Sequence, residues 1–112
     1  MLPGPNSLVS GVLVNTDGAS TLVVAAPGDG YKNFITEIYI YNSSAGAVTV
    51  DIRDGVAGGV KWTLGVPAGG QSQIQFVNGL GGFSNNTGIA IDASGAASSL
   101  YVSINGFKRQ TT

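Results

Sequence analysis

The sequence predicts an all-β protein, an antiparallel β-sandwich of about eight strands that is jelly-roll-like and carries an extended N-terminal arm. Segments rich in Val, Ile, Thr, Tyr and Phe are separated by turns rich in Gly, Asn, Ser and Asp, at intervals of roughly 8 to 12 residues. Several segments alternate apolar and polar residues, and no window has a helical period. At 112 residues the chain is long enough to bury a core of its own.

The strands can be placed in chain order. An apolar run and a shorter one precede a strongly aromatic segment, "NFITEIYIYN", and five segments with period-two alternation follow it. Between them lie turn sequences such as "NSSAG", "DG" and "PAGG". The expected strands cover residues 11–14, 21–26, 33–42, 48–53, 60–66, 73–77, 89–92 and 100–107.

Residues 1–11, "MLPGPNSLVSG", contain two prolines and few strand formers. We expect an extended arm there, followed by one domain over residues 12–112. The alternative is a frayed terminus without a role. If the arm reaches a neighbouring subunit, its contact residues are Leu2, Pro3, Pro5, Leu8 and Val9.

Composition excludes much of known chemistry. The chain has no cysteine and no histidine, which removes disulfides, thiol catalysis, the usual catalytic triads and nearly all zinc sites. Charged residues make up only 10% of the chain and the net charge is −1. The five basic residues form no run longer than Lys108-Arg109. We therefore expect no cofactor, no metal and no nucleic-acid partner.

No stretch of the sequence is typical of a signal peptide, and nowhere do about 18 apolar residues follow one another. We therefore expect no membrane partner. The low charge density also gives little repulsion between copies, which favours association.

The strand at residues 33–42 differs from the others because both of its faces are mostly apolar or aromatic. A strand of a monomeric sandwich normally has one polar face. We expect a loop, the arm or another subunit to cover the second face, and tyrosine suits a subunit interface. The hypothesis is a homo-oligomer, and the alternative is that tyrosines merely decorate a sheet. The interface residues would be Ile35, Glu37, Tyr39 and Tyr41, extended by Tyr101.

The stretch "APGDGYKNF" at residues 26–34 holds two glycines and a lysine near an apolar run. A phosphate-binding loop needs a different spacing and must open a helix. Here Asp29 stands where a phosphate would approach, and the stretch leads into a strand. We therefore interpret it as a turn.

The connection at residues 77–87, "VNGLGGFSNNT", is the longest irregular one, and long loops often make functional contacts. Neutral amides and aromatic rings also suit carbohydrate, which remains an alternative ligand. Trp62, however, is in phase with Val60 and Leu64 and is expected in the core. The expected contact residues of this loop are Asn78, Leu80, Phe83, Asn85 and Asn86.

Acidic residues offer little support for catalysis. A hydrolase would need two carboxylates brought together from distant strands. Asp51, Asp54 and Asp92 are the residues available for that purpose. Solvated charges on strands and turns are the simpler interpretation, and we expect no enzyme.

The segments "PGDGYKNFITEIYIYNSSAGAVTVDIRDG", "VPAGGQSQIQF" and "LYVSINGFKR" together resemble small β-sandwich structural proteins of tailed bacteriophages. The resemblance is one of pattern and covers roughly residues 20–109. It implies a head decoration, or cement, protein that sits as a trimer on the capsid surface and bridges neighbouring major capsid subunits. Its place would be the virion, with host cytoplasm during assembly. The alternative is a receptor- or carbohydrate-binding module of a tail or fibre.

Overall fold

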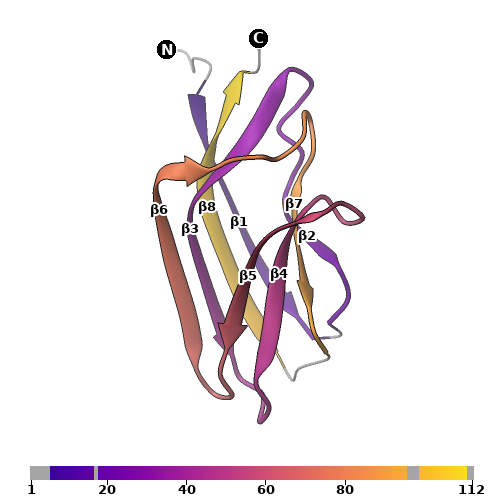
Figure 1. Cartoon of the computed structure of the whole chain (residues 1–112), viewed down its shortest axis with the longest axis vertical. Coiled ribbons are helices and arrows are strands. Elements are labelled where there is room, and N and C mark those ends of the chain that lie inside the picture. The colour runs from indigo at the N-terminus through magenta and orange to yellow at the C-terminus, as the bar shows by residue number, and fades with distance from the viewer. Residues whose placement is uncertain (1–5, 17, 96–98, 111–112) are drawn as a thin grey trace.

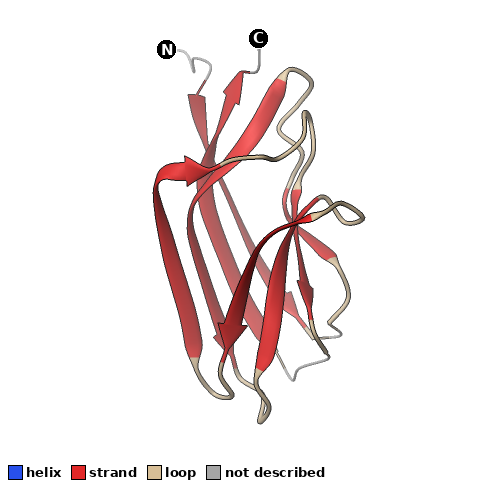
Figure 2. Cartoon of the chain, viewed as in Figure 1, coloured by secondary structure: helices blue, strands red, loops and turns tan. Residues whose placement is uncertain are grey.

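The computed structural model describes residues 6–16, 18–95 and 99–110. Eight strands lie in these ranges, and each corresponds to a segment expected from the sequence (Figures 1 and 2). They are β1 (Asn6–Asn15), β2 (Thr21–Val24), β3 (Tyr31–Asn42), β4 (Val48–Asp54), β5 (Val60–Val66), β6 (Gln71–Leu80), β7 (Ile89–Ala93) and β8 (Leu100–Gln110).

The strands form two four-stranded sheets with the orders β1-β8-β3-β6 and β2-β7-β4-β5. Every strand pairing is antiparallel. The two sheets face each other, and the chain crosses between them several times (Figure 1). This interleaved order is that of a jelly roll, so the predicted fold class is confirmed.

The core lies between the sheets and consists mostly of isoleucine, valine and leucine. Ile38 and Ile40 of β3 and Ile104 of β8 meet Val50 and Ile52 of β4, and all five are 0% exposed. Each such side chain contributes about 1.5–3 kcal/mol when it leaves water. The alternation in β4 and β8 reflects this burial, because every second residue faces the other sheet.

Strand β3 contains a bulge that explains its two apolar faces. Its register with both β6 and β8 shifts between Ile35 and Glu37. The extra residue, Thr36, reverses the alternation, so Ile35 faces the core before the bulge, as Ile38 does after it. The assignment of Ile35 to an outward interface with Glu37 is therefore wrong. A strict period of two across residues 33–42 does not account for the bulge.

The N-terminal segment is a strand from Asn6 onward. β1 pairs with β8 in an unbroken register from Asn6 opposite Arg109 to Asn15 opposite Leu100. The expected arm is therefore wrong for residues 6–11, because their backbone is held in the sheet. Leu8 and Val9 belong to this strand, whereas Leu2, Pro3 and Pro5 lie outside the described residues.

Strand β6 also extends further than expected and bends at its end. Gln75 lies opposite Glu37, but the next paired residue is Leu80, opposite Ile35. The residues between leave the ladder, and the backbone at Gly79 adopts a φ of 85°. Figure 1 shows this end of β6 turning across the molecule. Asn78 and Leu80 are therefore strand residues, and the predicted loop at 77–87 begins only after Leu80.

Candidate functional site

The strongest candidate is the outer face of the first sheet, the face of β1-β8-β3-β6 that points away from the second sheet. Directly paired residues of antiparallel strands point to the same side, so the registers define rows across this face. Two apolar rows enclose a polar centre. The rows are Leu8–Phe107–Phe34, Ser10–Asn105–Glu37–Gln75, Val12–Ser103–Tyr39–Gln73 and Val14–Tyr101–Tyr41–Gln71.

The predicted residues Glu37, Tyr39, Tyr41 and Tyr101 do share this face. The rings of Tyr41 and Tyr101 lie 6.0 Å apart, and Tyr101 is 45% exposed. The Tyr39 hydroxyl donates a hydrogen bond to Gln71 Oε1 at 2.7 Å. Their place at a subunit interface remains a prediction, but the fold has brought four of the five proposed residues together.

Sequence analysis missed the most exposed apolar part of this face. In β1 the side chains of Leu8, Val12 and Val14 are 91%, 80% and 52% exposed. Val9 and Leu13, on the other side of the strand, pack against the core. The signal was available in the sequence, because β1 is apolar in both phases, as β3 is. The expected arm obscured it. We call Leu8, Val12, Val14 and the neighbouring Tyr101 the outer stripe.

One end of the face is covered by the bent end of β6. The rings of Phe34 and Phe107 stack at 5.1 Å, and a Cβ built on Gly81 would lie only 2.8 Å from the Phe34 ring. A Cβ on Gly79 would lie 3.0 Å from the Phe107 ring. The loop predicted as one possible cover of the aromatic strand therefore exists, but it covers Phe34 and not the tyrosines.

A shallow depression of about 320 Å³ lies beside the stripe. The β3 bulge forms its floor, where Thr36 Oγ1 donates a hydrogen bond to the Asn105 carbonyl oxygen at 3.2 Å. No ionisable side chain lines it. The lining residues are Leu8, Val9, Ser10, Thr36, Asn105 and Gly106.

The predicted contact loop is largely a structural element. Phe83 is 1% exposed and belongs to the core, so it is not free to contact a partner. The exposed Asn85 and Asn86 bind the turn at residues 28–30. A contact role for the loop remains untested, but its shape is set by these internal contacts.

The same contacts settle the phosphate-loop question. The backbone N–H of Gly28 donates to Asn86 Oδ1 at 3.0 Å, and that of Gly30 donates to Asn85 Oδ1 at 2.9 Å. Asn85 Nδ2 in turn donates to Asp29 at 2.9 Å. The amides that a phosphate would need are thus already bonded to side-chain oxygens, and the turn interpretation is confirmed.

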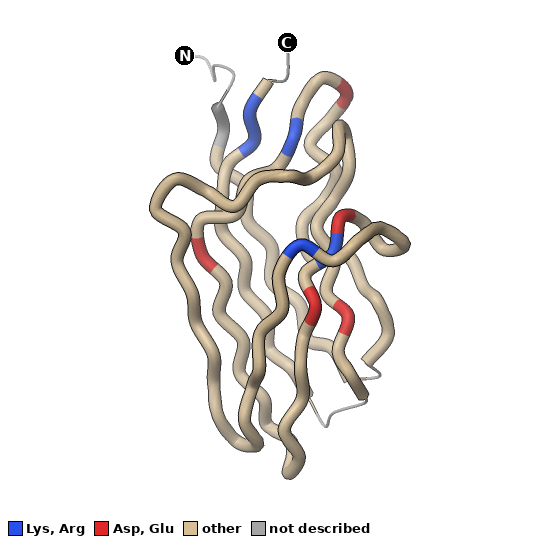
Figure 3. Tube along the Cα trace, viewed as in Figure 1, with Lys and Arg blue, Asp and Glu red and all other residues tan. Residues whose placement is uncertain are grey.

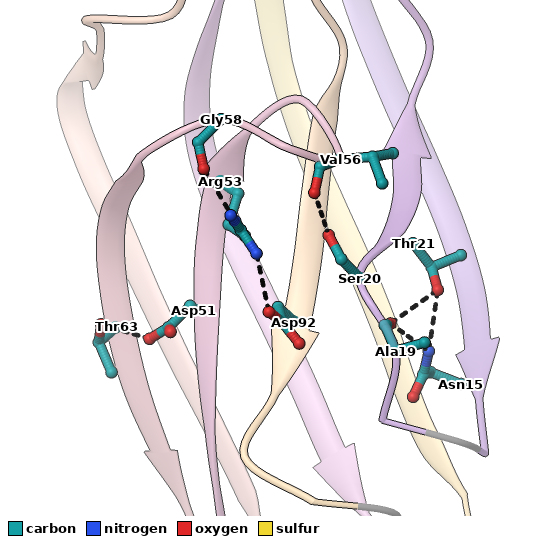
Figure 4. A network of polar contacts seen from close by, with 10 residues as sticks. All are labelled: Asn15, Ala19, Ser20, Thr21, Asp51, Arg53, Val56, Gly58, Thr63 and Asp92. Atoms are coloured by element: carbon teal, nitrogen blue, oxygen red, sulfur yellow. Dashed lines mark hydrogen bonds and ion pairs between the residues drawn. The ribbon is translucent and has the colours of Figure 1, made fainter.

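The second sheet carries the acidic residues considered for hydrolysis, of which Figure 4 shows Asp51 and Asp92. Asp51 and Asp92 lie directly opposite each other in the ladder, which the sequence did not reveal. Asp92 pairs with Arg53 at 2.9 Å, and Asp51 accepts a hydrogen bond from Thr63 at 2.8 Å. Asp54 accepts hydrogen bonds from the Ser84 backbone and hydroxyl. These contacts hold strands and loops together.

Two further findings concern metals and membranes. Within residues 6–16, 18–95 and 99–110, no group of three acidic, His or Cys side chains is placed to hold a metal ion. The part of the chain that the structure describes contains no helix long and apolar enough to cross a membrane.

The fold gathers basic residues that the sequence scatters. Lys32 lies opposite Arg109, next to Lys108, at the end of the molecule where β1 begins (Figure 3). Lys108 Nζ donates a hydrogen bond to the Pro27 carbonyl oxygen at 3.2 Å. The Arg109 guanidinium lies 5.2 Å from the Phe34 ring centre. Two of the three cations are thus occupied by intramolecular contacts.

The amides that suggested carbohydrate are also engaged. Gln71 Oε1 accepts a hydrogen bond from the Tyr39 hydroxyl, and Gln73 Nε2 donates one to the Glu37 carboxylate at 2.6 Å. Trp62 is 38% exposed, so its expected place in the core is wrong. It lies at the rim of the sandwich because β5 is an edge strand, and its ring meets Phe76 edge-on at 5.1 Å.

Comparison with known proteins defines the fold only. No protein-family model and no curated protein matches the chain. Among solved structures, the coat protein of Tobacco streak virus matches with a TM-score of 0.56 and 13% identity, over 99% of this chain and 90% of that one. A chain of the cyanophage Pam1 capsid asymmetric unit matches with a TM-score of 0.54 and 13% identity, over 96% and 91%.

A third match comes from endospore appendages of Bacillus, described as disulfide-linked pili. Its TM-score is 0.53 and its identity 14%, over 100% of this chain and 96% of that one. At such identities a shared architecture is established, whereas a shared activity is not. The sandwich is therefore one that occurs in viral coats and in a bacterial fibre.

Proposed function

We propose that this chain is a non-enzymatic structural protein of a virus particle, which acts by contact with other protein subunits. The observation that carries the proposal is the outer stripe. Three aliphatic side chains and a tyrosine lie exposed on one face of a regular sheet. Apolar patches of this kind usually mark protein contact surfaces.

The polar groups of the described residues support the same conclusion. The carboxylates of Asp51, Asp54 and Asp92 bind neighbouring strands or loops, and the backbone amides of Gly28 and Gly30 bind asparagine side chains. A hydrolase needs such groups directed at a substrate within a cleft. Here they are used to hold the sandwich together.

The structural matches favour a viral particle over other assemblies. Two of the three proteins described above belong to viral coats, and each aligns over nearly its whole length with this chain. The third is a disulfide-linked pilus, and this chain has no cysteine with which to form such a link. The viral matches are therefore the better guide to the kind of assembly in which this chain takes part.

Within a virion, we favour the decoration role that the phage resemblance implies. The chain would sit on the capsid surface as a trimer, bind the major capsid protein and bridge its neighbours. Several simultaneous contacts would then have to break before the shell opens, which stabilises it. A receptor- or carbohydrate-binding role in a tail or fibre is less well supported, because Gln71 and Gln73 already bind neighbouring side chains.

The test is to add the purified protein to heads of the encoding phage that were assembled without it. We expect electron cryo-microscopy to show the protein at defined lattice positions, and we expect the temperature of head opening to rise. Empty lattice positions at saturating protein would overturn the proposal. Occupancy at three-fold positions would support the trimer. Occupancy at other positions would contradict the trimer and would give the symmetry of the bound protein instead.

A further inference from the structure

The four edge strands of the sandwich differ in how they are protected against pairing with another chain. Natural sheets protect their edges with short strands, charges, prolines or bulges. β2 has only four residues. β5 carries Lys61 and an irregular register, and β6 leaves its ladder after Gln75. Three of the four edges therefore have a protective feature.

β1 has none of these features. It is ten residues long, contains neither a charged residue nor a proline, and pairs with β8 without a single register shift. Its other edge is free of any partner strand among the described residues. Its outer side chains Leu8, Val12 and Val14 are exposed as well. A long, regular, apolar edge such as this readily pairs with another strand.

We propose that β1 pairs in antiparallel fashion with β1 of a second copy of this chain, about a two-fold axis perpendicular to the sheet. The two four-stranded sheets then join into one continuous sheet of eight strands. A two-fold contact uses the same surface on both copies, so this surface must complement itself. β1 meets that condition because its lack of charge removes any repulsion between the paired strands.

The rows of the outer face fix the register. Outer side chains must lie opposite outer side chains, which requires an even sum of paired residue numbers. With the axis at Gly11, Leu8 of one copy lies opposite Val14 of the other, and Ser10 lies opposite Val12. The apolar row of Tyr101 and Val14 then continues directly into Leu8 and Phe107 of the second copy.

The neighbouring register would pair Leu8 with Val12 but would leave Val14 without an apolar partner. With the axis at Ser10, Val14 would lie opposite Asn6, and the row would continue from Tyr101 into the charged Arg109. Both registers keep the three exposed aliphatic residues of β1 within the paired segment, but only the Gly11 register joins the Val14–Tyr101–Tyr41 row directly to the Leu8–Phe107–Phe34 row. It makes this junction twice, once on each side of the axis.

This inference concerns contacts between copies and does not depend on the capsid role. It is also compatible with it, because local two-fold positions of a capsid lattice lie between neighbouring three-fold positions. The β1 contact would then join copies that belong to adjacent trimers. The inference fails if self-association does not depend on β1, whereas the proposed function fails if lattice positions stay empty.

The first experiment measures mass in solution by sedimentation and light scattering at tens of micromolar protein. We expect the natural chain to show β1-dependent self-association and Val12→Lys to lose it, since the lysine places a charge on the paired edge. Val77→Lys is the matched control, because Val77 is 97% exposed on the opposite edge strand. Its association should be unchanged. A natural chain whose mass in solution equals that of the Val12→Lys variant would overturn the proposal.

The second experiment tests the register and uses the absence of native cysteine. Leu8→Cys and Val14→Cys chains, mixed in equal amounts and oxidised, should form a disulfide-linked dimer. Residues directly opposite each other lie at about 4.5–5.5 Å between Cα atoms, within disulfide range. Each variant alone should not cross-link, because its two cysteines would be six residues out of register, about 20 Å apart. Cross-linking of either variant alone, or none in the mixture, would overturn the register.

Discussion

At two strand glycines the backbone of another strand leaves no room for a side chain. A Cβ on Gly106 of β8 would overlap the Phe34 carbonyl oxygen, and one on Gly11 of β1 would overlap that of Val23. Backbone atoms cannot move aside as a flexible side chain can. Glycine is therefore required at both positions for space, without any unusual backbone angle.

We expect Gly106→Ala to lower the free energy of unfolding by about 3 kcal/mol or more, because the added methyl must displace the β3 backbone next to the bulge. Gly65→Ala is the control. Gly65 is also in a strand, but a Cβ there meets nothing within 4 Å. Its effect should stay within about 0.5 kcal/mol. Urea unfolding measures both, and equal midpoints would contradict the close approach.

At the scale of single elements, the bulge in β3 and the bend in β6 determine what the outer face presents. The bulge places Ile35 in the core and leaves Glu37, Tyr39 and Tyr41 outside. The bend lays Gly79 and Gly81 on two phenylalanine rings. The aromatic strand is thus covered at one end by its own chain and remains open at the other.

The loop that follows β6 contributes to the core through Phe83. We expect Phe83→Ala to cost about 3–5 kcal/mol of stability, as for other buried aromatic residues. The control Val77→Ala removes an apolar side chain that is 97% exposed in the neighbouring strand and should have almost no effect. The measurement is the thermal or urea unfolding midpoint. A loop that only contacts partners would tolerate both changes.

The sequence predicted where the strands lie far better than which side of each strand faces the core. Alternation, apolar runs and turns predict at least part of all eight strands, because these are local properties, although for β1 they predict only residues 11–14. The inward position of Ile35 and the strand character of Leu8 and Val9 depend on a bulge and on pairing with β8, about 100 residues away in the chain. Both phases of β1 are apolar in the sequence, but Leu8 joins the outer stripe only because its backbone pairs with β8. Trp62 was misplaced because alternation does not reveal which strands lie at an edge.

The whole molecule is a flattened body of 45 × 25 × 18 Å whose few charges lie mostly away from the outer stripe (Figure 3). Polar groups on the outer face are neutral except for Glu37, Lys32 and Arg109. Contacts built on the outer stripe are therefore apolar in character. Their strength should depend on buried area far more than on ionic strength.

We accordingly expect self-association to persist from about 0.05 to 1 M sodium chloride, where exposed ion pairs are largely screened. Sedimentation at both salt concentrations measures it. Addition of a thiol reductant serves as a control, because a chain without cysteine should show no change in association or unfolding. Dissociation at high salt would show that the basic end of the molecule, rather than the stripe, makes the contact.

The pairing of Asn6 with Arg109 brings the start of β1 and the end of β8 to the same pole of the long axis (Figure 1). A passenger protein joined directly to Asn6 or to Gln110 would leave from that pole, far from Gly11 at the middle of β1. In a pair joined through β1, the two poles point in opposite directions. The two fused proteins would then lie at opposite ends of the pair. The chain could therefore hold two fused proteins at a fixed separation.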